Sequence, residues 1–212
     1  VIAAGPSYDT WDYICATYNG YLYNLTHAQR LNEAELMQQA ARNYPGDHLR
    51  NEALHLKVWY NNVGRDSSVW IAEKRAAIKT LERRGATWYA LRTKWNLFSL
   101  TAGFGTSYPV AFATAEELID DIDGLDRKQY PFVGTLYEEI GTLYYRFRDY
   151  ETANPLLEKA TRDEPGLYND RSNLRGRNTL GVYYRSVGDS VRSDEYFRSI
   201  LQSRDSIYDR PV

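Results

Sequence analysis

Cysteine and histidine are scarce in this 212-residue chain, which contains one cysteine, Cys15, and three histidines, His27, His48 and His55. A single cysteine excludes an internal disulfide, and it favours a small buried side chain over a catalytic nucleophile. The chain contains neither a CxxC nor an HExxH motif, and we expect His48 and His55 to lie on different elements. The sequence therefore predicts neither a metal site nor a bound cofactor.

Long apolar runs and an excess of one charge are also missing. No stretch of 18 apolar residues occurs, so no transmembrane helix is expected in this segment, and nothing resembles a secretory signal peptide. The 26 Lys and Arg residues are balanced by 28 Asp and Glu residues, which gives a formal net charge of −2. This balance argues against nucleic-acid binding by this segment. Because the chain begins at Val1 and stops where another repeat could begin, we expect a fragment of a longer protein.

The motifs of common catalytic and calcium sites are absent as well. The chain has no GxSxG, Walker or dinucleotide-binding pattern. Gly103-Phe104-Gly105 lacks the strand that precedes a phosphate-binding loop, so it predicts a flexible turn. The acidic residues between Asp120 and Asp126 lack the spacing of an EF-hand loop, so they predict a solvated helix end. Together these absences predict a protein that is not an enzyme.

What the chain does contain is a repeat of apolar and small residues between positions 134 and 167. Counting Gly134 as position one, they occupy positions 4, 7, 8, 11, 20, 24, 27 and 32: Tyr137, Ile140, Gly141, Tyr144, Ala153, Leu157, Ala160 and Pro165. This is the signature of the 34-residue tetratricopeptide repeat, a pair of antiparallel helices. Gly141 allows the first helix to approach the second closely, Asp149 suits an N-cap, and Pro165 ends the second helix.

The same frame recurs between positions 174 and 208. With Leu174 as position one, Leu180, Gly181, Tyr184 and Phe197 fall at positions 7, 8, 11 and 24, and Ser193 takes the small position 20. Gly141 and Gly181 lie 40 positions apart, six more than the repeat length. We expect the six extra residues in a turn-rich connection around 166–173.

The earlier part of the chain carries weaker versions of this pattern. Residues 86–125 predict a worn repeat, with Phe98, Ala111, Ala115 and Leu118 at the signature positions. Residues 1–85 predict degenerate helical hairpins, because helical periodicity alternates with turn residues. The helices expected before residue 125 cover 9–24, 28–43, 51–62, 68–84, 86–101 and 108–122. The predicted fold is therefore all-α: one solenoid of about ten helices in antiparallel pairs, forming an α-α superhelix.

Repeat proteins of this kind usually bind their partners on the concave face, which the first helix of each pair lines. The family contact positions fall on residues whose side chains suit carboxylates or sugars, since Arg pairs with carboxylates and Tyr both stacks and donates a hydrogen bond. We expect a protein or peptide partner, with a small ligand or an oligosaccharide as the alternative. The candidate binding residues are Glu138, Thr142, Tyr145, Arg146, Arg175, Asn178 and Arg185.

The tract IGTLYYRFRDYETANPLLEKA, followed by NTLGVYYRSVGDSVRSDEYFRSIL, resembles the repeat region of Bacteroidetes membrane-linked regulators. That resemblance implies an extracytoplasmic (periplasmic) repeat array, followed by a transmembrane helix and a DNA-binding or histidine-kinase output. The chain would then be the sensory or interaction part of a signalling or transcription regulator. Without the resemblance we expect a cytoplasmic protein. Two other functions remain open: a stand-alone scaffold or assembly protein, and a glycan-binding outer-membrane lipoprotein, which exposed coplanar Trp or Tyr residues would favour.

Overall fold

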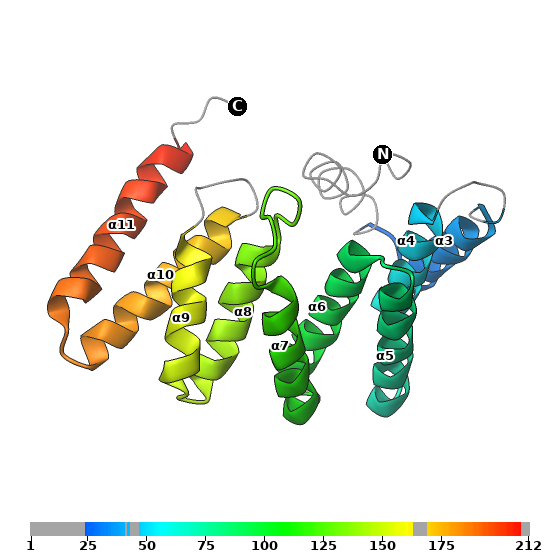
Figure 1. The fold of residues 1–212 in the computed structure, drawn as a ribbon, viewed down its shortest axis with the longest axis horizontal. Coiled ribbons are helices and arrows are strands. Elements are labelled where there is room, and N and C mark those ends of the chain that lie inside the picture. Colours follow the sequence, from blue (N-terminus) through cyan, green and yellow to red (C-terminus); the bar gives the residue numbers. More distant parts are fainter. Residues whose placement is uncertain (1–23, 41, 43–46, 163–168, 209–212) are drawn as a thin grey trace. The chain divides into compact units, whose positions relative to one another are not determined.

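The computed structural model describes residues 24–40, 42, 47–162 and 169–208 (Figure 1). This part of the chain contains nine helices and no strand. The helix expected over residues 9–24 lies outside the described residues. The helices are α3 (His27–Ala40), α4 (His48–Trp59), α5 (Ser67–Arg83), α6 (Thr87–Gly103), α7 (Tyr108–Ile122), α8 (Val133–Arg146), α9 (Tyr150–Thr161), α10 (Asn169–Ser186) and α11 (Ser190–Tyr208).

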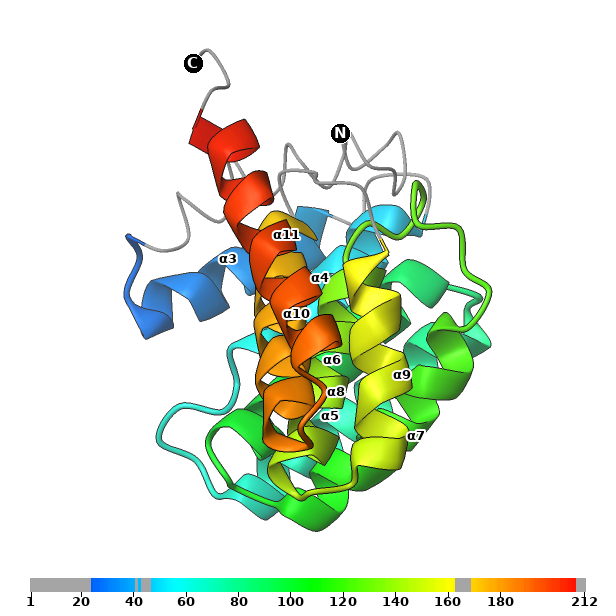
Figure 2. The ribbon, with the colours of Figure 1, turned by 90° about the vertical axis from the view of Figure 1, so that its left-hand side faces the viewer.

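The chain divides into two compact units, Val1–Tyr130 (unit 1) and Pro131–Val212 (unit 2). In unit 1, α4 pairs with α5 and α6 pairs with α7, and α3 packs on α4. In unit 2, α8 pairs with α9 and α10 pairs with α11 (Figure 2). The first helices of successive pairs also pack on each other, α4 on α6 and α8 on α10. Within each unit the fold is therefore a stack of helical hairpins, which confirms the predicted all-α solenoid class.

The predicted close approach between the helices of a pair is present in both hairpins of unit 2. A Cβ atom on Gly141 would lie 2.9 Å from Leu157 Cγ and 3.2 Å from the Ala153 backbone oxygen. A Cβ atom on Gly181 would lie 2.9 Å from Phe197 Cε1. At both positions an added side chain would therefore require atoms of the partner helix to move.

Matching turns join the helices of these two hairpins. Arg148 and Gly188 both occupy position 15 of the repeat frame, and both are left-handed, with φ of 63° and 85°. Asp149 then caps α9 by accepting a hydrogen bond from Thr152 N at 3.1 Å, and Asp189 accepts from Arg192 N at 3.1 Å. The predicted N-cap at Asp149 is confirmed, and a left-handed residue followed by Asp defines the turn in each hairpin.

The worn repeat of unit 1 also has the expected core. Phe98, Ala111, Ala115 and Leu118 are all at most 2% exposed. The buried alanines on α7 are small enough for α6 to pack closely against them. Ala153 has the same role on α9, where α8 packs against it. The apolar spacing alone therefore located the core of the α6–α7 hairpin.

Two expectations about helix starts are wrong. The turn-rich connection expected around 166–173 is helical from Asn169, where α10 begins. Asn173, 4% exposed, donates a side-chain hydrogen bond to the Thr161 backbone oxygen at 3.0 Å, which joins α10 to the end of α9. Asn and Asp favour helix starts as well as turns, and here the contact with α9 decides between them. Likewise α4 begins at His48, so His48 and His55 share one helix.

Candidate recognition surface

The predicted binding residues lie on two neighbouring helices, α8 and α10. Residues three, four or seven positions apart share one side of a helix, so the candidates on each helix form one stripe. We call these the α8 stripe and the α10 stripe. The α8 stripe consists of the candidates Glu138, Thr142, Tyr145 and Arg146. The α10 stripe consists of the candidates Arg175, Asn178 and Arg185, together with Val182 on the same side of α10.

Three of the candidates meet where the two stripes touch. The carboxylate of Glu138 accepts hydrogen bonds from Thr142 Oγ1, at 3.0 Å, and from Arg175 Nη2. Burial raises the pKa of the Glu138 carboxyl, whose residue is only 3% exposed, while the Arg175 guanidinium opposes that rise. Glu138 therefore joins α8 to α10, and its carboxylate is already engaged within the chain.

The exposed part of this surface comes mainly from arginine, asparagine and valine. Arg146 ends α8 and is exposed, and Asn178 is exposed on α10. Arg185 is ion-paired with Asp194 on α11, with Nη2 and Oδ1 3.2 Å apart and both side chains about half exposed. Val182 adds an apolar side chain that is 46% exposed. The surface is therefore cationic and polar with one apolar side chain.

Tyr145 takes part in a packing arrangement that the sequence reasoning did not identify. Its ring lies 5.3 Å from that of Tyr150 on α9, and the series continues from ring to ring through Tyr183, Tyr184 and Tyr196. The first three ring pairs are inclined by 62°, 43° and 67°. The fourth pair, Tyr184 and Tyr196, is stacked at 5°, but Tyr184 is buried. Tilted rings pack well edge to face, but they do not form a flat sugar-binding platform. Burial raises the pKa of Tyr145, in keeping with a half-buried packing side chain.

In unit 1 an ion pair joins the first helices of two successive hairpins, as the Glu138–Arg175 contact does in unit 2. Glu52 on α4 pairs with Arg92 on α6 at 3.4 Å, with both side chains at most 7% exposed. Beside them, the fully buried His55 places Nδ1 2.9 Å from Thr93 Oγ1. Burial and the nearby Arg92 hold the pKa of His55 well below its usual value, so the ring is neutral. His55 is therefore a neutral, buried packing residue.

A buried lysine accompanies this group. Lys74 on α5 is fully buried, and its Nζ donates to the Val58 backbone oxygen and to Asn96 Oδ1, the latter at 2.7 Å. Burial lowers the pKa of its amine to about 7. The hydrogen bonds stabilise the amine inside the hairpin stack. No sequence signal distinguishes this lysine from the exposed ones.

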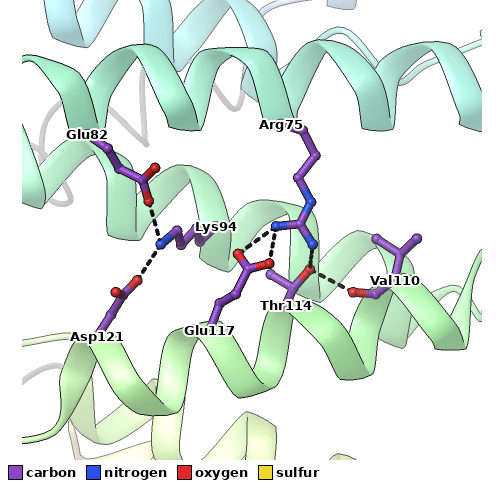
Figure 3. A network of polar contacts seen from close by, with 7 residues as sticks. All are labelled: Arg75, Glu82, Lys94, Val110, Thr114, Glu117 and Asp121. Atoms are coloured by element: carbon purple, nitrogen blue, oxygen red, sulfur yellow. Dashed lines mark hydrogen bonds and ion pairs between the residues drawn. The ribbon is translucent and has the colours of Figure 1, made fainter.

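A second polar network links α5, α6 and α7 (Figure 3). Lys94 lies between Glu82 and Asp121, with ion-pair distances of 2.6 and 2.5 Å. Arg75 on α5 holds Glu117 on α7 at 2.6 Å and donates to Thr114. Asp121, expected at a solvated helix end, is therefore a partner of Lys94 rather than a purely solvated carboxylate.

Comparison with known proteins identifies no family for the chain. No protein-family model matches it, and no curated protein matches it. A crystal structure of BtubC (BKLC) from P. vanneervenii is similar, with 14% sequence identity and a TM-score of 0.47. The similarity covers 89% of this chain and 95% of that one.

The described residues contain neither a cluster of metal-ligating side chains nor a membrane-spanning helix. No group of three or more His, Cys, Asp or Glu side chains there could hold a metal ion. Among the same residues, every helix is too short or too polar to cross a membrane. The stripes on α8 and α10 therefore remain the main candidate surface in unit 2.

Proposed function

We propose that the chain is a tetratricopeptide-type recognition module that binds a protein or peptide partner on the α8 and α10 stripes. The observation that carries this proposal is the hydrogen-bonded contact between Glu138 on α8 and Arg175 on α10. This contact joins the first helices of two successive hairpins, so the exposed polar residues of both helices can contact the same partner. Helical-repeat proteins bind extended partners on such surfaces.

Burial at the signature positions supports the tetratricopeptide assignment. Ile140, Ala153 and Leu157 are completely buried, and Ala160 is 1% exposed. Gly141 lies where a side chain would meet the partner helix. The repeat consensus specifies small or apolar residues at these positions because the paired helices pack together there.

The exposed side chains indicate what the partner carries. Arg146 and Arg185 can each present a fork of N–H donors to a carboxylate, and Asn178 can donate to a backbone carbonyl. Val182 offers a small apolar contact. A peptide segment with acidic and apolar side chains fits this chemistry, whereas the tilted tyrosine rings give a glycan no flat platform.

The resemblance to membrane-linked regulators supports a role for this binding step in signal transduction. In this proposal the module lies outside the cytoplasm and its partner sets the state of an output domain elsewhere in the protein. The binding event itself uses no catalytic group and no cofactor.

A thermal-shift screen of the chain against peptides and oligosaccharides tests the proposal. A ligand present at a hundred times its dissociation constant stabilises the folded form by about 2.7 kcal/mol. Calorimetry on a peptide hit should show weaker binding to Asn178→Ala and Arg185→Ala. Arg83→Ala is the matched control, because Arg83 is exposed on α5 in unit 1 and belongs to neither stripe. Equal binding to all three variants would contradict the proposed surface.

A further inference from the structure

A groove runs over α3, α4 and α5 in unit 1. Its volume is about 600 Å³, and it is open to solvent rather than enclosed. Its apolar lining comes from all three helices and consists of Leu31, Leu54, Val58, Ala76 and Ala77. Hydrogen-bonding side chains also line it, among them Asn61, Thr80 and Lys57.

A smaller pocket of about 220 Å³ shares Leu54 and Arg84 with the groove. Its other described lining residues are Gln38, Arg42 and Arg50, so it contains three arginines and no carboxylate among the residues described. The Arg84 guanidinium donates to the neutral Asn51 Oδ1 at 3.1 Å. A guanidinium has five N–H donors, so this bond leaves Arg84 able to hold a carboxylate as well.

The groove is lined by two carboxylates, and the cationic side chains around it outnumber them. Glu73 is held by Arg65 through two hydrogen bonds of 2.7 and 2.8 Å, and it also accepts from Asn61. Glu35 is the other acidic residue among the described lining. Asp47 lies 3.8 Å from Arg50, but Lys57 and the arginines of the small pocket still outnumber the acidic charge, so the surface favours an anionic ligand.

We infer that this groove and pocket bind an acidic peptide segment, with a carboxylate in the arginine pocket and apolar side chains in the adjoining groove. Charge complementarity selects the acidic residue, because arginine binds carboxylates through two parallel hydrogen bonds. The apolar groove provides the contact area. The polar lining favours a peptide over an alkyl carboxylate, since a peptide backbone can use Asn61, Thr80 and Lys57 as hydrogen-bond partners. This site is distinct from the α8 and α10 stripes.

Selection of 12-residue peptides from a display library on the intact protein tests the inference. We expect the enriched peptides to carry Asp or Glu beside Leu, Ile, Val or Phe. Their affinity should fall about tenfold or more in Arg84→Glu and in Arg50→Glu, and it should weaken as salt is raised. Arg83→Glu is the matched control, because Arg83 is exposed, adjacent in sequence and not part of either lining.

The outcomes separate this site from the proposed function. Peptides that lose affinity in Arg84→Glu but bind Asn178→Ala normally support the groove, whatever happens at the α10 stripe. Equal loss in Arg83→Glu and Arg84→Glu, or enrichment without acidic residues, would overturn the inference. Binding of dodecanoate at this site without binding of any selected peptide would also overturn it, in favour of a small alkyl anion.

Discussion

Arg175 on α10 donates a hydrogen bond to the buried carboxylate of Glu138 on α8, and so joins the first helices of two successive hairpins. Unit 1 repeats the relationship with Glu52 on α4 and Arg92 on α6. In both cases the Glu comes from the earlier helix and the Arg from the later one. The recurrence indicates that such pairs fix the packing of the first helices within each unit, and in unit 2 these helices carry the candidate recognition surface.

Removing Arg175 should destabilise the protein more than removing Arg185. The Arg175→Ala change leaves the buried carboxylate of Glu138 without its charged partner, at a cost of about 1–3 kcal/mol. The Arg185–Asp194 pair is exposed, and pairs of that kind contribute about 0–1 kcal/mol. Urea unfolding of Arg175→Ala and Arg185→Ala compares the two directly, and equal midpoints would mean that the buried pair does not stabilise the hairpin stack.

Alanine at Gly141 and at Gly181 should have different effects. Alanine gains up to about 1 kcal/mol in helix propensity. At Gly141, however, the new Cβ meets the fully buried Leu157 and a backbone oxygen, and overpacking costs roughly 1–3 kcal/mol. At Gly181 it meets only the far end of the half-buried Phe197 ring, which can shift.

We therefore expect Gly141→Ala to lower the free energy of unfolding and Gly181→Ala to change it little. Denaturant unfolding monitored by circular dichroism measures both variants. A larger loss in Gly181→Ala than in Gly141→Ala would show that the α8–α9 contact is looser than the structure indicates.

Glycine at position 148 should stabilise the α8–α9 turn. Arg148 has a φ of 63°, a left-handed conformation that costs a residue with a side chain about 1–2 kcal/mol. Gly188 occupies the same position in the next hairpin at no such cost. Because glycine also loses more entropy on folding, we expect Arg148→Gly to raise the unfolding free energy by about 0.5–1 kcal/mol.

The reverse substitution provides the control for that turn. Gly188→Ala should destabilise the α10–α11 hairpin by about 1 kcal/mol, although nothing lies within 4 Å of the added Cβ. Thermal unfolding of both variants checks the pair. Stabilisation by Gly188→Ala, or destabilisation by Arg148→Gly, would be incompatible with left-handed turns.

Lys74 should make stability depend on pH above neutrality. Burial lowers the pKa of its amine from 10.5 to about 7. Between these pH values the unfolded chain binds a proton that the folded chain has released, so the unfolding free energy rises with pH. The slope is at most about 1.4 kcal/mol per pH unit, and below about pH 7 this contribution becomes constant.

Unfolding by urea at several pH values between about 7 and 9 measures this slope, below the ionisation of ordinary tyrosines. Lys74→Met removes the titrating group, so its slope should be smaller even though the change leaves Asn96 Oδ1 without this donor. An unchanged slope in Lys74→Met would mean that the amine is charged in the folded protein.

The spacing of small and apolar residues was sufficient to predict the hairpins. Gly141, Ala153 and Leu157 define one helix contact by size alone, and α7 begins and ends where its periodicity does, at Tyr108 and Ile122. Such patterns depend on residues that are close together in the sequence, and their recurrence in successive repeats strengthens the prediction of the helix pairs. They do not require knowledge of distant partners.

The polar contacts could not be predicted in the same way. Glu138 was expected on an exposed face, but its partner Arg175 lies 37 positions further along the chain. Lys74 resembles any helical lysine until Val58 and Asn96 are placed around it. Ser193 occupies a small-residue position as predicted, yet its buried hydroxyl lacks a partner in the described structure. Pairing across helices depends on tertiary geometry, which no local pattern contains.

The most direct test of the account is a residue-resolved map of where a bound peptide contacts the protein. Amide chemical shifts recorded by NMR, with and without a stabilising peptide from the screen, provide that map. We expect shifts concentrated on the α8 and α10 stripes, including Arg146, Asn178 and Arg185, and we expect these shifts to be lost in Asn178→Ala. Shifts confined to α9 and α11 would contradict the claim that the α8 and α10 stripes form the recognition surface.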